Sequence, residues 1–159
     1  MDEEQGFVVL EKIERKGMLL LLTFSNGFEV RATRGTVKKL ELTEGFEFSP
    51  TGFREVKTLL LERFALYCAE SLLARRNYSV GEFKERLRQK EIGLDMIKRI
   101  VAEFRRLDLL DDYRYGQMRV RSVIRRKPAG RGFLIADLQK RLVPRDIAEK
   151  VVTEALKDS

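Results

Sequence analysis

The sequence predicts a mostly α-helical protein, with two tandem three-helix repeats preceded by a small antiparallel β-hairpin module. The segment from Ala65 to Glu103 aligns without a gap on the segment from Gly116 to Glu154, which indicates a period of about 51 residues. Apolar residues change from alternating to helical spacing near Arg54. These observations place the β module at residues 1–53, the first repeat at 54–110 and the second at 111–159.

The β module contains three short apolar segments with strand-like patterns. The strands are expected over residues 7–13, 18–24 and 28–33. Gly17 separates the first two, and Asn26-Gly27 predicts a two-residue hairpin turn in which both residues adopt positive φ. One helical turn is expected over residues 36–40. Three strands make a very small core, so we expect this module to depend on the next helix for stability.

Apolar residues at helical spacing predict three short helices in each repeat. The helices are expected over residues 54–75, 80–90, 96–107, 112–126, 133–142 and 144–155. Ser79, followed by Glu82 three residues later, predicts a capping box. Asp111 is suited to be the N-cap of the fourth helix, and Pro144 suits the first turn of the sixth.

The composition argues against an enzyme. The chain has no His, which removes the commonest general base and metal ligand. Its single cysteine, Cys68, lies on an apolar helix stripe, so a buried thiol is favoured over a nucleophile. Asp111-Asp112 could hold a metal ion, but their position before a helix favours capping. We therefore expect no catalytic residue, metal or cofactor.

The sequence predicts a cytoplasmic, monomeric protein that does not associate with membranes. The longest apolar run, Met18 to Leu22, is far too short to cross a bilayer. The acidic residues at the N-terminus are unlike a secretion signal, which begins with positive charge followed by an apolar core.

The net charge of +7 arises entirely beyond residue 54. Basic residues cluster in both repeats, and Arg75-Arg76 aligns with Arg126-Lys127. A stacked array places such residues at intervals along one side, which suits a polyanion or a filament, whereas the alternative is a merely solvated face. The candidate partner-binding or DNA-binding residues are Arg75, Arg76, Lys84, Arg88, Lys90, Arg119, Arg121, Arg125, Arg126, Lys127 and Arg131.

An ordered set of short motifs resembles the RecX family of recombination regulators over nearly the whole chain. Leu109-Leu110-Asp111-Asp112, followed by Tyr115-Gly116, resembles the family signature L-[IL]-[DN]-D-x-x-[YF]-A. Two further elements are similar to the family pattern, one at Gly130, Leu134, Leu138, Arg141 and Val143 and the other at Ser79, Phe83, Leu87, Lys90 and Ile92. Glu91 and Leu142 stand where the family usually has Gly.

The resemblance implies a non-enzymatic modulator of the RecA recombinase, acting in DNA repair, DNA recombination and the SOS response. Such proteins bind the RecA–DNA filament and limit its activity or growth. Two alternatives remain from the residues alone. One is a sequence-independent binder of single- or double-stranded DNA, and the other is a helix-turn-helix transcription regulator, which the scarcity of Asn and Gln on residues 96–107 and 144–155 disfavours.

Overall fold

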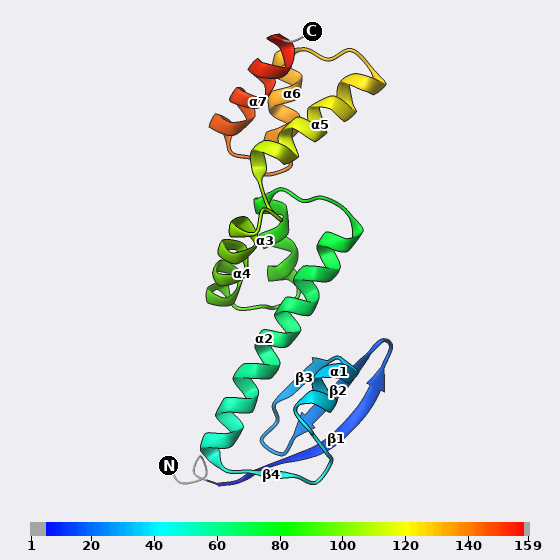
Figure 1. Cartoon of the computed structure of the whole chain (residues 1–159), viewed down its shortest axis with the longest axis vertical. Helices are drawn as coiled ribbons and strands as arrows, with labels where there is room; N and C mark the ends of the chain where they lie inside the picture. The colour runs from blue at the N-terminus through cyan, green and yellow to red at the C-terminus, as the bar shows by residue number, and fades with distance from the viewer. Residues whose placement is uncertain (1–5, 158–159) are drawn as a thin grey trace. The chain divides into compact units, whose positions relative to one another are not determined.

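The computed structural model describes residues 6–157, which are mostly helical, with a small antiparallel sheet before the main helices (Figure 1). The elements are β1 (Val8–Lys16), β2 (Leu19–Phe24), β3 (Glu29–Ala32), α1 (Arg34–Lys39), β4 (Glu47–Phe48), α2 (Pro50–Arg75), α3 (Val80–Gln89), α4 (Leu94–Arg106), α5 (Asp112–Arg126), α6 (Arg131–Lys140) and α7 (Arg145–Lys157). The chain divides into two compact units, one up to Tyr67 and the other from Cys68 onward, and α2 contributes residues to both.

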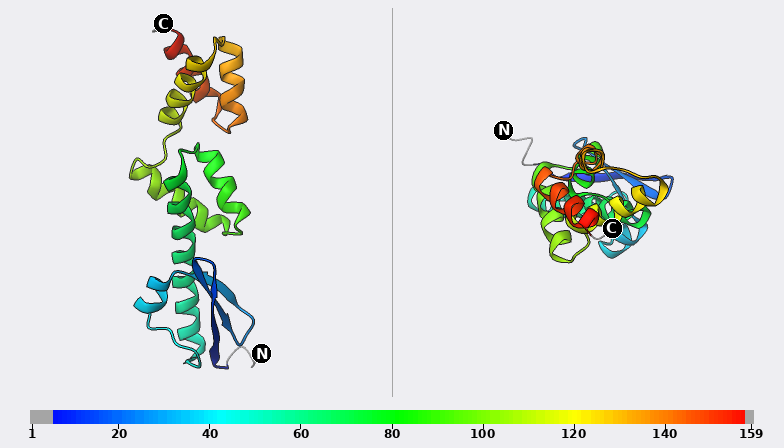
Figure 2. Two further views of the ribbon diagram at one scale, coloured as in Figure 1. Left: turned by 90° about the vertical axis from the view of Figure 1, so that its right-hand side faces the viewer. Right: turned by 90° about the horizontal axis from the view of Figure 1, so that it is seen from above.

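The first unit is a four-stranded sheet in the order β3-β2-β1-β4, with the first half of α2 packed against it (Figure 2). Alternation along the strands directs Leu10 and Phe24 into the core, where both are almost completely buried. Phe53 and Leu60 of α2 belong to the same core, and the Phe24 and Phe53 ring centroids lie 5.3 Å apart. The β module thus shares its core with the next helix, and its dependence on that helix for stability stays a prediction.

The turn between β2 and β3 differs from the sequence prediction. The Phe24 N–H donates to the Phe28 carbonyl, and the Gly27 N–H donates to the Phe24 carbonyl, each at 2.9 Å. The loop is therefore three residues long, Ser25-Asn26-Gly27, and only Gly27 has positive φ, at 91°. This is the pattern of a type I turn followed by a left-handed glycine. The prediction of a two-residue turn with positive φ at Asn26 was wrong, because Phe24 pairs with Phe28 across the loop.

A fourth strand, β4, was not expected from the sequence. It consists of two residues that pair with the start of β1, with Phe48 opposite Val8 and Glu47 opposite Val9. Two residues are too few to show an alternating pattern in the sequence. The strand is therefore defined by its pairing with β1 and not by a local signal.

The helix starts in the second unit follow the local sequence signals. Ser79 accepts a hydrogen bond from the Glu82 N–H while the Glu82 carboxylate accepts from the Ser79 N–H, which confirms the capping box. Asp111 caps α5 by accepting from the Arg114 N–H. Pro144 lies one residue before α7, and its carbonyl accepts from the Ala148 N–H.

The helices α5, α6 and α7 enclose an apolar core to which each contributes, as Val120, Leu138 and Val152 show (Figures 1 and 2). The chain leaves α6 through Leu142, whose φ is 66°. The Val143 N–H donates to the Leu138 carbonyl and the Leu142 N–H donates to the Gln139 carbonyl, which is a Schellman motif. Glu91 ends α3 in the same way, at φ 63°. Glycine adopts positive φ most easily, which explains why the RecX pattern usually has Gly where this chain has Glu91 and Leu142.

Candidate partner and nucleic-acid interface

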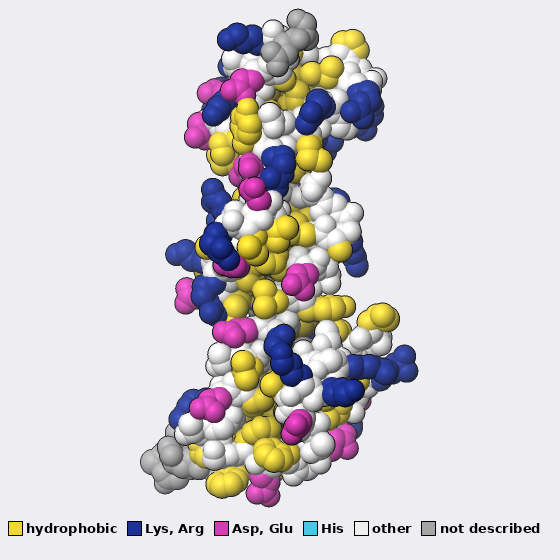
Figure 3. Space-filling model, viewed as in Figure 1, with side chains coloured by type: hydrophobic (Ala, Val, Ile, Leu, Met, Phe, Trp, Pro, Cys, Tyr) yellow, Lys and Arg dark blue, Asp and Glu magenta, His cyan; other side chains and the backbone are white. Residues whose placement is uncertain are grey.

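The second half of α5 and its C-cap residue carry four cations that we call the α5 basic face: Arg121, Arg125, Arg126 and Lys127. All four are exposed, and none forms an ion pair with another described residue. Arg121 and Arg125 are four residues apart and so lie on the same side of the helix. Figure 3 shows Lys and Arg side chains gathered over this part of the molecule. This face is therefore free to contact an anionic partner.

The remaining cations of this segment are held by neighbours. The Arg119 guanidinium donates to both carboxylate oxygens of Asp137, at 2.8 and 3.1 Å, and both side chains are largely buried. The Arg131 guanidinium donates to the Thr153 hydroxyl at 2.5 Å. Arg119 thus joins α5 to α6, and we leave it out of the candidate surface although the sequence grouped it with the other cations.

The basic cluster around α3 is partly neutralised by carboxylates at Glu82 and Glu85. The Arg76 guanidinium lies 3.8 Å from the centre of the Tyr78 ring and 3.6 Å from the Glu82 carboxylate. Arg88 pairs with Glu85 at 2.5 Å. The candidate residues left exposed without an ion pair, among residues 6–157, are Arg75, Lys84 and Lys90.

The first turn of α3 is fastened to two later parts of the chain. The Ser79 hydroxyl donates to the Arg141 carbonyl at 2.6 Å, and the Val80 N–H donates to the Asp112 carboxylate at 2.8 Å. Burial raises the pKa of Asp112 above its usual value, and the hydrogen bond from Val80 partly opposes that shift. Gly81 leaves the space for Leu142 to approach. Asp112 therefore has a structural partner, in agreement with the preference for capping over metal binding.

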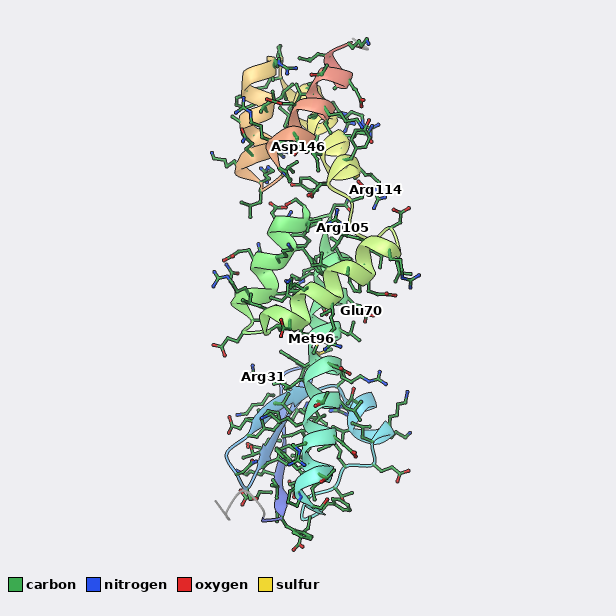
Figure 4. The ribbon with its side chains drawn as sticks, turned by 90° about the vertical axis from the view of Figure 1, so that its left-hand side faces the viewer. Arg31, Glu70, Met96, Arg105, Arg114 and Asp146 are labelled. Carbon is green, nitrogen blue, oxygen red and sulfur yellow. The ribbon has the colours of Figure 1, made fainter. Side chains whose placement is uncertain are left out.

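The link between α4 and α5 is held by Arg114, which Figure 4 labels at the start of α5. Its guanidinium donates to the Asp108 carbonyl at 2.7 Å and lies 3.8 Å from the carboxylates of Asp108 and Asp111. This bond stabilises the carbonyl of Asp108, a non-glycine residue with φ at 65°.

The Arg119–Asp137 pair makes the free energy of unfolding depend on pH. Hydrogen bonding to Arg119 lowers the pKa of Asp137, so the folded state binds its proton less readily than the unfolded state. The stabilisation is present above the unfolded pKa of about 4 and is lost as the pH falls through the lower folded pKa. Asp137→Asn should cost about 1–3 kcal/mol at neutral pH, because Arg119 loses its charged partner.

This prediction is checked by urea unfolding from pH 7 to pH 2. Asp137→Asn should flatten the acid-dependent loss of stability, whereas Asp146→Asn, an exposed acid on α7, should leave it unchanged (Figure 4). Parallel pH profiles for Asp137→Asn and the unsubstituted protein would contradict the proposed role of the pair.

The described residues contain neither a metal-binding cluster nor an activated nucleophile. No three side chains of His, Cys, Asp or Glu within residues 6–157 are placed to share a metal ion. Cys68 is buried, and burial raises the pKa of its thiol, which disfavours the reactive thiolate. No helix in the same range has both the length and the apolar character needed to span a membrane.

The chain is similar to several bacterial proteins named Regulatory protein RecX. It is 34% identical over 94 residues to the one from Pelodictyon phaeoclathratiforme, covering 59% of this chain and 56% of that protein. The one from Streptococcus uberis is 20% identical over 149 residues, covering 94% of this chain and 56% of that protein. The chain thus spans little more than half the length of these relatives. No family model matches it.

Two solved structures share the fold. A crystal structure of regulatory protein RecX superposes with a TM-score of 0.61 at 15% identity, over 92% of this chain and 73% of that one. The crystal structure of RecX from Lactobacillus salivarius gives a TM-score of 0.57 at 24% identity, over 58% of this chain and 60% of that one. The sequence relatives and the Leu-Leu-Asp-Asp motif before α5 agree in making the chain similar to proteins of the RecX family, and the two solved structures show that it shares their fold.

Proposed function

We propose that this chain is a non-enzymatic regulator of homologous recombination, which binds the RecA–DNA filament through a basic helical face and limits RecA activity. Similarity to proteins named Regulatory protein RecX supports this function. The observation that carries it for this chain is the α5 basic face, whose four cations have no carboxylate partner among the described residues. Arg75, Lys84 and Lys90 add to the proposed surface.

We also infer that the helices from residue 54 onward form two tandem units, residues 54–110 and 111–159, after a β module at 1–53. The bounds of the helices support this division. The ten-residue helices α3 and α6 begin at Val80 and Arg131, and the thirteen-residue helices α4 and α7 begin at Leu94 and Arg145. Both intervals equal the period of about 51 residues in the sequence. A tandem arrangement suits a long, regular partner.

Free cations are well suited to a filament that contains DNA. Lys and Arg at a phosphate backbone release condensed counterions, which gives sequence-independent affinity. Guanidinium groups additionally form paired hydrogen bonds with phosphates and with carboxylates of a protein surface. The α5 basic face offers three guanidinium groups and one ammonium group, so it can contact both components of a nucleoprotein filament.

The test is the single-stranded-DNA-dependent ATPase of the cognate RecA, titrated with this protein. Suppression at substoichiometric protein is expected, because a regulator of filament growth affects many RecA subunits for each bound molecule. Binding to RecA-coated DNA should also be tighter than binding to the same bare DNA. An unchanged ATPase, together with equal affinity for bare and coated DNA, would contradict the proposal.

The same unpaired cations favour one second candidate, a sequence-independent DNA-binding protein. Its affinity for bare DNA would fall steeply with salt, with a slope of about −0.9 per neutralised phosphate on duplex DNA. Such binding without any effect on the RecA ATPase would select this alternative.

A further inference from the structure

A groove of about 700 Å³ lies between α5 and α7, beside the α5 basic face. Its apolar lining comes from Val120 and Ile124 of α5 and from Val151 and Ala155 of α7. Val120 and Val151 are almost completely buried and form the floor, whereas Ile124 is 38% exposed. Figure 3 shows hydrophobic side chains on this three-helix part of the molecule, with Lys and Arg beside them.

One small residue, Ala155 of α7, belongs to the lining of the groove. Ala155 corresponds to Phe104 when the two aligned segments of the sequence are extended by one position. Phe104 is buried, and its ring centroid lies 5.8 Å from that of Phe83. The alanine at the corresponding site of α7 has no ring, so a larger apolar side chain introduced there would take up space beside the groove lining.

The rim of the groove is basic. Arg121, Arg125 and Lys157 line it and are exposed, and none forms an ion pair with another described residue. Glu154 is the one acid in the lining, and its carboxylate accepts a hydrogen bond from the Tyr113 hydroxyl. The unbalanced charge at the rim is therefore positive, which complements an acidic ligand.

We propose that this groove docks an acidic amphipathic helical segment of a partner protein. Apolar side chains of that segment would occupy the space above Val120 and Val151, and its flanking carboxylates would pair with Arg121, Arg125 and Lys157. This is the helix-in-groove mode of recognition, in which apolar anchors give affinity and the charged rim orients the segment. The proposal deepens the proposed function and rests on it, since it identifies the protein component of the contact.

The lining favours a peptide over nucleic acid. Proteins that hold single strands present aromatic faces on which bases stack. Tyr113 is the aromatic residue in this lining, and the Lys150 ammonium already lies 5.1 Å from the centre of its ring. The aliphatic floor contributes nothing to phosphate binding but provides apolar contact for side chains such as Leu.

The experiment uses a fluorescein-labelled helical peptide with Leu at positions i, i+4 and i+7 and Glu on the flanking positions. Fluorescence anisotropy measures its binding to the full chain, to Ala155→Phe, which fills the groove without changing charge, and to Arg121→Glu. Lys38→Glu is the matched control, because it changes the net charge equally but Lys38 lies on α1, outside both the groove and the α5 basic face. A Lys-for-Glu version of the peptide and a labelled oligonucleotide test the role of charge.

We expect the acidic peptide to bind the unsubstituted chain. Ala155→Phe and Arg121→Glu should each lower the affinity for the peptide by about tenfold or more, which is the size of effect seen when a central contact of an interface is lost. Lys38→Glu should change the affinity by no more than about twofold, as for a charge outside the contact. Circular dichroism checks that each variant folds. If Ala155→Phe does not fold, Arg121→Glu still tests the proposal. Absence of peptide binding, or equal binding by Ala155→Phe and the unsubstituted chain, would overturn the proposal.

The oligonucleotide separates the two ligand classes, because stronger competition by oligonucleotide than by excess unlabelled acidic peptide would also overturn the groove assignment. Failure of the proposed function has a different signature, namely an unsubstituted chain that leaves the RecA ATPase unchanged. Regulation of the ATPase without peptide binding would reject the groove and keep the function.

Discussion

Replacing Arg125, Arg126 and Lys127 with Glu is expected to weaken binding to the RecA–DNA filament by about 100-fold or more, because three attractive contacts become repulsive. These residues belong to the α5 basic face and have no ion-pair partner within residues 6–157. Their replacement therefore leaves no carboxylate within that range without its cation. The measurement is equilibrium binding to RecA-coated single-stranded DNA at fixed salt.

Two controls separate a specific contact from a general effect of charge. Arg34, Lys38 and Lys39 replaced with Glu change the net charge by the same amount, on helix α1 of the first unit. This control variant should bind nearly as well as the unsubstituted chain. Arg125 and Arg126 also lie in the last turn of α5, where cations favour the helix dipole by about 0.3–1 kcal/mol each, so circular dichroism must show that the helix content is retained. Equal losses in both triple variants would reject the α5 basic face as the contact.

Gly81→Ala is expected to lower the free energy of unfolding by about 1–3 kcal/mol, the usual effect of overpacking. A Cβ atom at Gly81 would lie 2.6 Å from the Cβ of Leu142 and 2.9 Å from its carbonyl oxygen. Neither atom can move easily, since Leu142 is held in the Schellman motif that ends α6. The substitution should therefore loosen the contact of α3 with the end of α6.

The chain supplies a matched control for this substitution. Gly132 is the second residue of α6, as Gly81 is of α3, and a Cβ atom there would meet nothing within 4 Å. Gly132→Ala should be neutral or stabilising by up to about 1 kcal/mol, because alanine favours the helix. Urea unfolding of both variants, followed by circular dichroism, compares them directly. Equal midpoints would show that the close approach of Leu142 to Gly81 does not constrain the protein.

Local signals in the sequence were sufficient for the starts of α3 and α5, whereas α2 begins at Pro50, four residues before the expected start. Ser79 and Asp111 cap their helices with their own side chains, so the residues that decide these starts lie within a few positions of one another. The Asn26-Gly27 signal located the hairpin correctly but not its loop length. That length depends on which residues of the two strands pair, and Phe24 pairs with Phe28.

The candidate surface was only partly predictable. The sequence identified the run of basic residues in α5, but it could not separate the free cations from Arg119. Asp137 follows Arg119 by 18 residues, and only the packing of α5 against α6 brings the two side chains together. Likewise, Arg76 is neutralised by Glu82 because the chain turns between α2 and α3.

The sequence by itself determined the helical class, the caps, the excess of positive charge beyond residue 54 and the motifs of the family, because these are properties of neighbouring residues. The tertiary structure decided which cations remain free, that Gly81 must be small, and that α5 and α7 form a groove between them. Those features depend on distances between residues far apart in the chain. Such distances are set by the packing of helix on helix, which no local pattern records.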